Sequence, residues 1–262
     1  MKLHRINAVI VRHVYEARRN FDRVIDTVWW PVLDIIMWGF FTVYLAHSNR
    51  LQPTVVSCLL GAVILWGTFY SFQRDMAVAF IDDLWCRNLI NLFSTPLMMS
   101  EYMAGIIVVC ILKVMVGLIA ASAIGWAAYS FDILPWLPKF IPYMANLLFF
   151  ALALGTAITG LIFRYSTKVQ ALAWSFAGLL MPVSCIFYPI SSLPKWLQAV
   201  AWMMPTAHSF EGMRQVLAGQ GFSLTHFAWG AGLNVVYFAL AIVFFGWIFE
   251  KARTRGLLVK QE

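Results

Sequence analysis

The amino-acid sequence predicts an all-α polytopic membrane protein with six transmembrane helices. Of its 262 residues, 61% are apolar, and the mean hydropathy is +0.76. Only 12% are charged, against roughly 25% in soluble globular domains. Six apolar runs each reach the length of about 17–25 residues that a membrane-spanning helix needs. One six-helix domain therefore accounts for the chain.

The apolar runs give the expected order of elements along the chain. They cover residues 28–46, 55–72, 102–129, 141–163, 169–190 and 227–249. We divide the single domain 1–262 into an interfacial helix at 1–27, spans one to five at 28–190, a pair of external re-entrant helices at 191–226, and the last span with a cytoplasmic tail at 227–262.

The amino-terminal segment has a helical period of apolar residues. These step by four or three along one face: Ile6, Ile10, Val14, Ala17, Phe21 and Val24. The opposite face is charged and carries Arg12, Glu16, Arg19, Arg23 and Asp26. This pattern favours a helix in the cytoplasmic interface, with its apolar side in lipid and its arginines at anionic headgroups. A solvated helix before the first span is the alternative.

The basic residues predict the orientation. With the amino terminus inside, fourteen Lys and Arg residues fall on the inner side and four on the outer side, while Lys113 lies within a span. This bias places both termini in the cytoplasm. The net charge of +7 follows from this topology and requires no nucleic-acid partner.

The connection between the second and third runs, residues 74–101, contains a second amphipathic pattern. Its apolar residues have helical spacing between Asp82-Asp83 and Pro96, and they are Leu84, Trp85, Leu89, Leu92 and Phe93. A helix with one exposed apolar face on the cytoplasmic side fits a groove on a partner protein. The alternative is a helix that packs back on its own bundle.

Two charged residues, Asp34 and Lys113, lie inside predicted spans. Charge in a bilayer is costly, so such residues are usually paired, in contact with water or functional. An Asp34–Lys113 pair, contact of either with substrate, and snorkelling to water all remain open. The spans hold no further acidic or histidine groups for a proton relay, which argues against a proton-coupled transporter.

The segment from Phe187 to Gly219 predicts two helices too short to cross a bilayer. Ser192 and Pro194 form a helix-start signal, Pro205 a break and Gly219 a stop. Each helix has roughly ten residues, about half the length needed to span. Two short amphipathic helices here suggest an external gate. A surface loop that rests on lipid is the alternative.

Sequence patterns of catalysis and metal binding are absent. The chain has no phosphate-binding loop, no zinc-protease motif and no nucleophile elbow. Its four cysteines are scattered singly and make neither a metal spacing nor a disulfide framework. We therefore expect a non-catalytic chain without a metal or cofactor of its own, and an intramembrane enzyme is disfavoured. If ATP hydrolysis drives this protein, another polypeptide must carry it.

Two motifs resemble the ABC-2 family of ATP-binding-cassette transporter permeases, and the resemblance covers the whole chain. The first runs from Trp85-Cys86-Arg87-Asn88-Leu89 through Thr95-Pro96-Leu97 to Glu101. The second, more specific motif is Tyr188-Pro189-Ile190 with Leu193-Pro194, Trp196-Leu197, Pro205 and then Glu211 to Arg214. One departure is that Asp82-Asp83-Leu84 stands where many members carry glutamate, arginine and a glycine-threonine.

The resemblance implies a homodimer of this chain above two copies of an ABC ATPase subunit that binds Mg-ATP, in the bacterial cytoplasmic (inner) membrane. ATPase coupling would fall to Asp82, Asp83, Trp85, Arg87, Leu89 and Phe93. The external gate would contain Tyr188, Pro189, Pro194, Trp196, Glu211 and Arg214. The translocation path would be lined by Asp34, Trp38, Phe41, Lys113, Trp174 and Phe176.

The same resemblance implies export. A path lined by apolar and aromatic side chains suits an amphiphilic or lipid-like substrate (a glycolipid or lipid-linked polysaccharide, a lipid or a hydrophobic drug) better than free sugars or ions. The alternative function is a membrane assembly or signalling subunit that binds an ATPase without moving a substrate. Fold-level similarity does not choose among the substrates.

Overall fold

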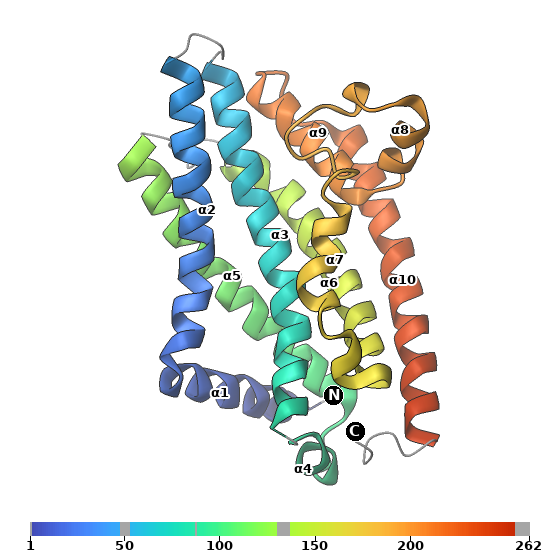
Figure 1. Ribbon diagram of the computed structural model, residues 1–262. Helices are drawn as coiled ribbons and strands as arrows, with labels where there is room; N and C mark the ends of the chain where they lie inside the picture. The colour runs from blue at the N-terminus through green and yellow to red at the C-terminus, as the bar shows by residue number, and fades with distance from the viewer. Residues whose placement is uncertain (1, 48–52, 87, 130–136, 255–262) are drawn as a thin grey trace.

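The computed structural model describes residues 2–47, 53–86, 88–129 and 137–254, which form helices and no strands. The long helices stand side by side (Figure 1). Helices α1 and α4 and the end of α10 lie at one end of the molecule, and α8 and α9 lie toward the other. The beginning and the end of the described chain are thus on the same side, as the charge bias requires.

Five helices exceed 25 residues, namely α2 (Phe21–His47), α3 (Pro53–Trp85), α5 (Met99–Tyr129), α6 (Leu137–Tyr165) and α10 (Leu224–Thr254). The shorter elements are α1 (Leu3–Arg19), α4 (Leu89–Ser94), η1 (Ser166–Val169), α7 (Leu172–Leu180), η2 (Ile190–Ser192), α8 (Lys195–Trp202) and α9 (Pro205–Leu217). The two predicted short helices before the last span are therefore present as α8 and α9.

Four stretches of the described residues are long and apolar enough to cross a membrane: Val24–Tyr44, Met99–Tyr129, Pro138–Tyr165 and Leu224–Lys251. They correspond to the first, third, fourth and sixth predicted spans, so the chain is a multi-pass membrane protein. The second predicted span, 55–72, lies within α3. Its crossing of the membrane remains a prediction.

The prediction of one uninterrupted helix over 169–190 is wrong. Helix α7 has nine residues, which is about 13 Å at 1.5 Å per residue. The chain then continues through turns, because Pro182 has no N–H to donate and Cys185 adopts a positive φ of 53°. The fifth apolar run is therefore a short helix followed by a compact non-helical segment.

The predicted interfacial helix is shorter than 1–27. Helix α1 ends at Arg19, Asn20 is extended, and α2 begins at Phe21. Residues 21–27 therefore belong to the first long helix. On α1 the buried apolar residue is Val9, which packs against Gly105 of α5, whereas Val14 of the predicted lipid face is 45% exposed.

The predicted cytoplasmic amphipathic helix is divided between two elements. Helix α3 continues beyond residue 72 to Trp85, and the six-residue α4 begins at Leu89. Between them Asn88 closes the end of α3, since its backbone N–H donates to Asp83 O at 2.9 Å and its side-chain amide donates to Asp83 Oδ1 at 3.3 Å. The residues Leu84 and Leu92 are thus not on one helical face.

Candidate functional site

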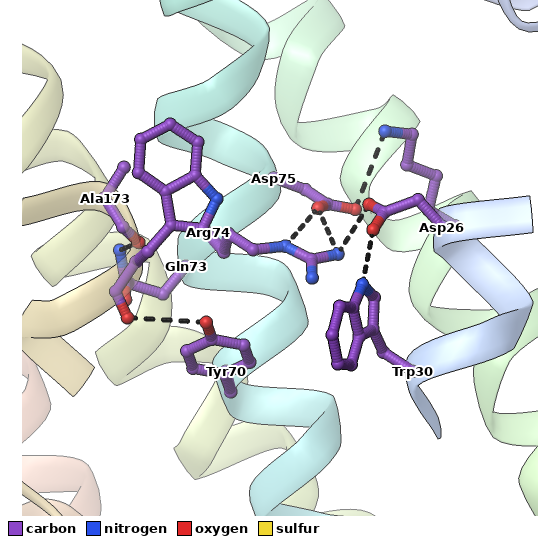
Figure 2. Close-up of polar contacts among 9 residues, drawn as sticks. Asp26, Trp30, Tyr70, Gln73, Arg74, Asp75 and Ala173 are labelled. Carbon is purple, nitrogen blue, oxygen red and sulfur yellow. Dashed lines mark hydrogen bonds and ion pairs between the residues drawn. The ribbon is translucent and has the colours of Figure 1, made fainter. Parts of the chain in front are cut away.

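Charged side chains from three helices meet between α2, α3 and α5 (Figure 2). Arg74 of α3 donates through Nε and Nη2 to Asp75 Oδ1, at 3.1 and 3.0 Å. Arg74 Nη2 also donates to Asp26 Oδ2 of α2 at 3.1 Å, and Lys113 Nζ of α5 lies 3.6 Å from Asp75 Oδ2. Asp26 Oδ1 accepts a further bond from Trp30 Nε1 at 2.7 Å. We call Asp26, Arg74, Asp75 and Lys113 the charge network.

The centre of the charge network is buried, with the side chains of Arg74 and Asp75 only 7% and 5% exposed. Removing one partner of such a pair leaves an uncompensated charge, which is far more costly than losing an exposed pair. The charge network therefore holds α2, α3 and α5 together and fixes their relative positions along the helix axes.

Sequence reasoning placed Arg74 in the connection after the second span, whereas the structure places it within the continuous helix α3. The apolar positions Phe72, Met76 and Phe80 continue the helical spacing past residue 72, and all three are buried. That continuing period was the signal that Arg74 and Asp75 lie within a helix.

Asp34 does not pair with Lys113. Lys113 reaches Asp75 instead, and among the residues that the structure describes, the Asp34 carboxylate has no hydrogen-bond or ion-pair partner. Asp34 is eight residues beyond Asp26 on α2, which places it about 12 Å farther along the helix axis. The Asp34 carboxylate, in the middle of the membrane helix Val24–Tyr44, is thus not paired with a cationic side chain of the described residues.

Two adjoining cavities open beside Asp34. The larger, about 350 Å³, extends toward the charge network, and its walls include Trp30, Tyr70 and Trp174. The smaller, about 200 Å³, is walled by Trp38, Trp66, Tyr70 and Phe187 among others. Asp34, Gly67 and Tyr70 line both. Cavities of a few hundred Å³ with mostly apolar walls and a few polar groups are typical of small-molecule sites.

Helix α7 forms one wall of these cavities and is held to α3 by two polar side chains. Tyr70 Oη donates to Trp174 O at 3.3 Å, and Gln73 Nε2 donates to Ala173 O at 3.2 Å (Figure 2). Beyond α7, the ring of Phe187 stacks on Trp38 of α2 at 4.4 Å. The cavities therefore lie between α2, α3 and α7.

The six residues predicted for the translocation path divide into two groups. Asp34, Trp38 and Trp174 line the two cavities. The others do not: Lys113 belongs to the charge network, Phe41 contacts the edge of Trp38 at 5.8 Å, and Phe176 packs against the core. The part of any of them in translocation stays a prediction.

At the α4 end, Asp83 joins three helices. Arg12 Nη2 of α1 lies 2.6 Å from Asp83 Oδ2, and Tyr102 Oη of α5 donates to the same oxygen at 2.6 Å. Burial acts to lower the pKa of Arg12, but the Asp83 carboxylate outweighs it and raises this pKa. The prediction that Arg12 faces lipid headgroups is wrong. Asp83 is enclosed, with 7% of its side chain exposed, so it does not fit a surface that contacts a partner.

The other residues predicted for ATPase coupling have different surroundings. Trp85 is 54% exposed at the end of α3, and Asp82 is half-buried. Arg87 and the side chains of Leu89 and Phe93 lie outside the described residues. A contact that sequence reasoning missed is at Glu101, whose carboxylate accepts from the backbone N–H of Lys2 at 2.7 Å and pairs with Arg5 at 3.2 Å. It ties the start of α1 to α5.

At the opposite end, Glu211 and Arg214 of α9 hold the non-helical segment that follows α7. Glu211 Oε1 accepts from the Ile190 backbone N–H at 2.7 Å. Arg214 Nη1 donates to Cys185 O at 2.8 Å, and Arg214 Nη2 lies 3.2 Å from Glu211 Oε1. This pair therefore supports the shape of the segment 185–190.

The remaining residues predicted for the external gate frame the short helices. Pro189 precedes η2, Pro194 precedes α8, and Tyr188 Oη donates to Pro182 O. Trp196 on α8 is 71% exposed. Helix α9, in contrast, is almost wholly buried and packs against α3, α6 and α10. The alternative of a loop resting on lipid is wrong for α9, while gating remains a prediction.

The family model of the ABC-2 type transporter matches residues 12–218. This stretch runs from α1 through α9 and includes the cavities and the charge network. The chain belongs to the ABC-2 type transporter family. It is the transmembrane permease component of an ABC transporter, a component that is typically non-catalytic. No curated protein matches the sequence.

Proposed function

We propose that this ABC-2 permease is the membrane subunit of an exporter that moves an amphiphilic or lipid-like substrate outward, driven by ATP hydrolysis in a separate subunit. The observation that supports it most is the pair of aromatic-walled cavities between α2, α3 and α7, in a chain of this family. Aromatic side chains offer large apolar surfaces together with polar edges. Such walls suit a molecule with both an apolar body and a polar group.

Helix α3 provides a mechanical connection for this function. It carries Tyr70 at the cavities and the exposed Trp85 at its end beside α4. Trp85 is fifteen residues beyond Tyr70, which corresponds to about 22 Å along the helix axis. Displacement of the Trp85 end by an ATPase subunit that binds Mg-ATP would therefore move the cavity wall.

The active assembly in this proposal contains two copies of the chain and two ATPase subunits in the cytoplasmic membrane, with both termini inside. The exposed face of α2 carries the large apolar side chains Met37, Phe40 and Tyr44. Large exposed apolar surfaces mark contacts with lipid or with another protein. This face is available to lipid and to the second copy.

A substitution at Trp85 tests the coupling. The complex of the full chain and its ATPase is reconstituted in liposomes, and ATP-driven movement of a panel of cationic, neutral and anionic fluorescent amphiphiles is measured. Because removing a central interface tryptophan commonly costs 2 kcal/mol or more, Trp85→Ala should lower amphiphile-stimulated ATP hydrolysis and export by about tenfold or more. Trp126→Ala, at an exposed tryptophan of α5, is the matched control and should change neither.

The outcomes separate the candidate functions. Export equal to wild type in Trp85→Ala would eliminate the coupling role of Trp85. A wild-type complex that binds its ATPase and moves no member of the panel would favour the non-transporting assembly subunit.

A further inference from the structure

The charges around the cavities do not balance. The charge network and the cavity walls together contain three carboxylates, on Asp26, Asp34 and Asp75, and two cations, on Arg74 and Lys113. Asp75 faces both cations, and Asp26 faces Arg74. The surplus negative charge is therefore that of Asp34, the carboxylate without a partner among the described residues. An isolated carboxylate in a membrane interior is unfavourable unless a cation or a proton neutralises it.

The walls beside Asp34 favour an organic cation. The ring faces of tryptophan and tyrosine attract cations and form the cages that recognise alkylammonium groups. Three such residues, Trp38, Trp66 and Tyr70, line the smaller cavity together with Asp34. In the smaller cavity an inorganic cation would have to exchange its hydration shell for mostly apolar walls, where Asp34 and Tyr70 supply the side-chain oxygens among the described lining residues. A weakly hydrated organic cation loses less on entry.

The geometry keeps the site open to a ligand. Helices α2 and α3 run in opposite directions (Figure 1). Asp34 is about 12 Å beyond Asp26 in one direction, and Trp66 is eight residues, also about 12 Å, before Arg74 in the other. Since Asp26 and Arg74 are paired, these two equal offsets bring Asp34 and Trp66 to about the same position along the bundle axis. Both residues line the smaller cavity. The Arg74 guanidinium lines the larger cavity with Asp34 and lies 5.7 Å from the centre of the Tyr70 ring, but its ion pairs are with Asp26 and Asp75 and not with Asp34.

We propose that Asp34 and the surrounding rings bind the cationic group of an amphiphile, an alkylammonium or other monovalent organic cation, whose apolar part extends along the cavities. Calling this ligand the substrate rests on the exporter function proposed above. The binding itself does not, and it can be measured without the ATPase.

The test uses two hydrophobic ions of the same shape and opposite charge, tetraphenylphosphonium and tetraphenylborate. The full chain in lipid nanodiscs is titrated with each by calorimetry, and empty nanodiscs provide the correction for partition into lipid. The wild type should bind the phosphonium saturably and the borate at least about tenfold more weakly. Contacts with a charged group are worth about 1.5–3 kcal/mol, so Asp34→Asn should lower phosphonium affinity by about 10- to 100-fold.

Three variants sharpen the test. Asp34→Glu keeps the charge and should retain most of the affinity. Glu250→Gln also replaces a carboxylate by an amide, on the exposed end of α10 away from the cavities, and should leave the affinity unchanged. Trp66→Leu removes one ring and should lower the affinity by about three- to tenfold, as expected for the loss of a cation–π contact.

Phosphonium affinity that is equal in wild type and Asp34→Asn would overturn the proposal, as would equal wild-type affinity for the two probes, the result expected of a permanently protonated Asp34. Competition by millimolar sodium would also overturn it in favour of an inorganic cation site. Selective cation binding without any transport would contradict the exporter function alone. Export of neutral amphiphiles without cation binding would contradict this inference alone.

Discussion

The two sides of α3 are built differently. On the side of α2, α5 and α7 there are cavities, four residues of a charge network and one unneutralised carboxylate. On the side of α6 and α9, with α10 beyond them, the packing is close, since a Cβ at Gly212 of α9 would overlap the ring of Tyr143 of α6. The polar contacts there include neutral amides, as in the bond from Asn234 Nδ2 to Asn146 O at 2.8 Å.

This difference shows how one helix serves two purposes. The close-packed side fixes α3 against α6, with the rings of Phe69 and Phe150 stacked at 5.9 Å. The other side contains the cavities, and its ion pairs hold α2 and α5 to α3. Empty space and an unpaired charge both reduce stability. Cavities on the side of α2 and α7, beside a carboxylate without a partner among the described residues, indicate that this side is specialised for binding.

The largest expected effect on stability distinguishes the paired carboxylate of Asp75 from the Asp34 carboxylate. Asp75→Asn leaves Arg74 and Lys113 with one carboxylate between them. Removing a charge from such a buried pair costs about 3 kcal/mol or more, and we expect a clearly lower midpoint of thermal unfolding in detergent. The matched change Asp34→Asn removes no partner and should leave the midpoint unchanged or raise it. Equal losses in the two variants would show that Asp34 is also paired.

A second pair of variants compares the packing on the two sides. In Gly212→Ala the new methyl group meets the ring of Tyr143, which is buried and fixed by a bond from Ser223 N–H at 3.0 Å. Overpacking of this kind costs about 1–3 kcal/mol, so the thermal midpoint should fall.

Gly67→Ala is the control, because a Cβ at Gly67 meets nothing within 4 Å. This variant should be as stable as wild type or more stable by up to about 1 kcal/mol, since alanine favours helix. A Gly67→Ala variant that unfolds as readily as Gly212→Ala would mean that the cavity is filled in solution by protein side chains.

The most local expected effect lies at the segment 185–190. Glu211→Ala removes the acceptor of the Ile190 N–H and the partner of Arg214. We expect a loss of about 2 kcal/mol and faster hydrogen exchange of the amide of Ile190, measured by mass spectrometry. Gln215→Ala, one turn farther along α9, should not change that exchange. Unaltered exchange in Glu211→Ala would indicate that other contacts hold segment 185–190.

Much of the fold follows from apolar pattern alone. The stretches Met99–Tyr129, Pro138–Tyr165 and Leu224–Lys251 were predictable because a membrane helix satisfies all its backbone groups within itself, so length and hydropathy are sufficient. The starts of α8 and α9 were predictable from Pro194 and Pro205, because proline lacks the N–H that a helix interior needs.

The candidate site was only partly predictable. Asp34, Trp38 and Trp174 were identified from sequence, because charge and aromatic residues within apolar runs are conspicuous. Arg74 and Asp75 were missed, since adjacent opposite charges after an apolar run resemble the end of a span. The division of α3 from α4 was also missed, as it depends on the contacts of Asn88 with Asp83.

The sequence by itself determined that this chain is a helical membrane protein, because apolar length and proline positions act locally, and two motifs carried its resemblance to the ABC-2 family. Only the tertiary structure decided which charges neutralise one another. Lys113 faced two possible carboxylates, and the choice of Asp75 over Asp34 depends on how α2, α3 and α5 lie against each other. The energy of an ion pair depends on the distance between its charges, and the packing of the helices sets that distance. Asp34 consequently lines the aromatic cavities without an ion-pair partner among the described residues.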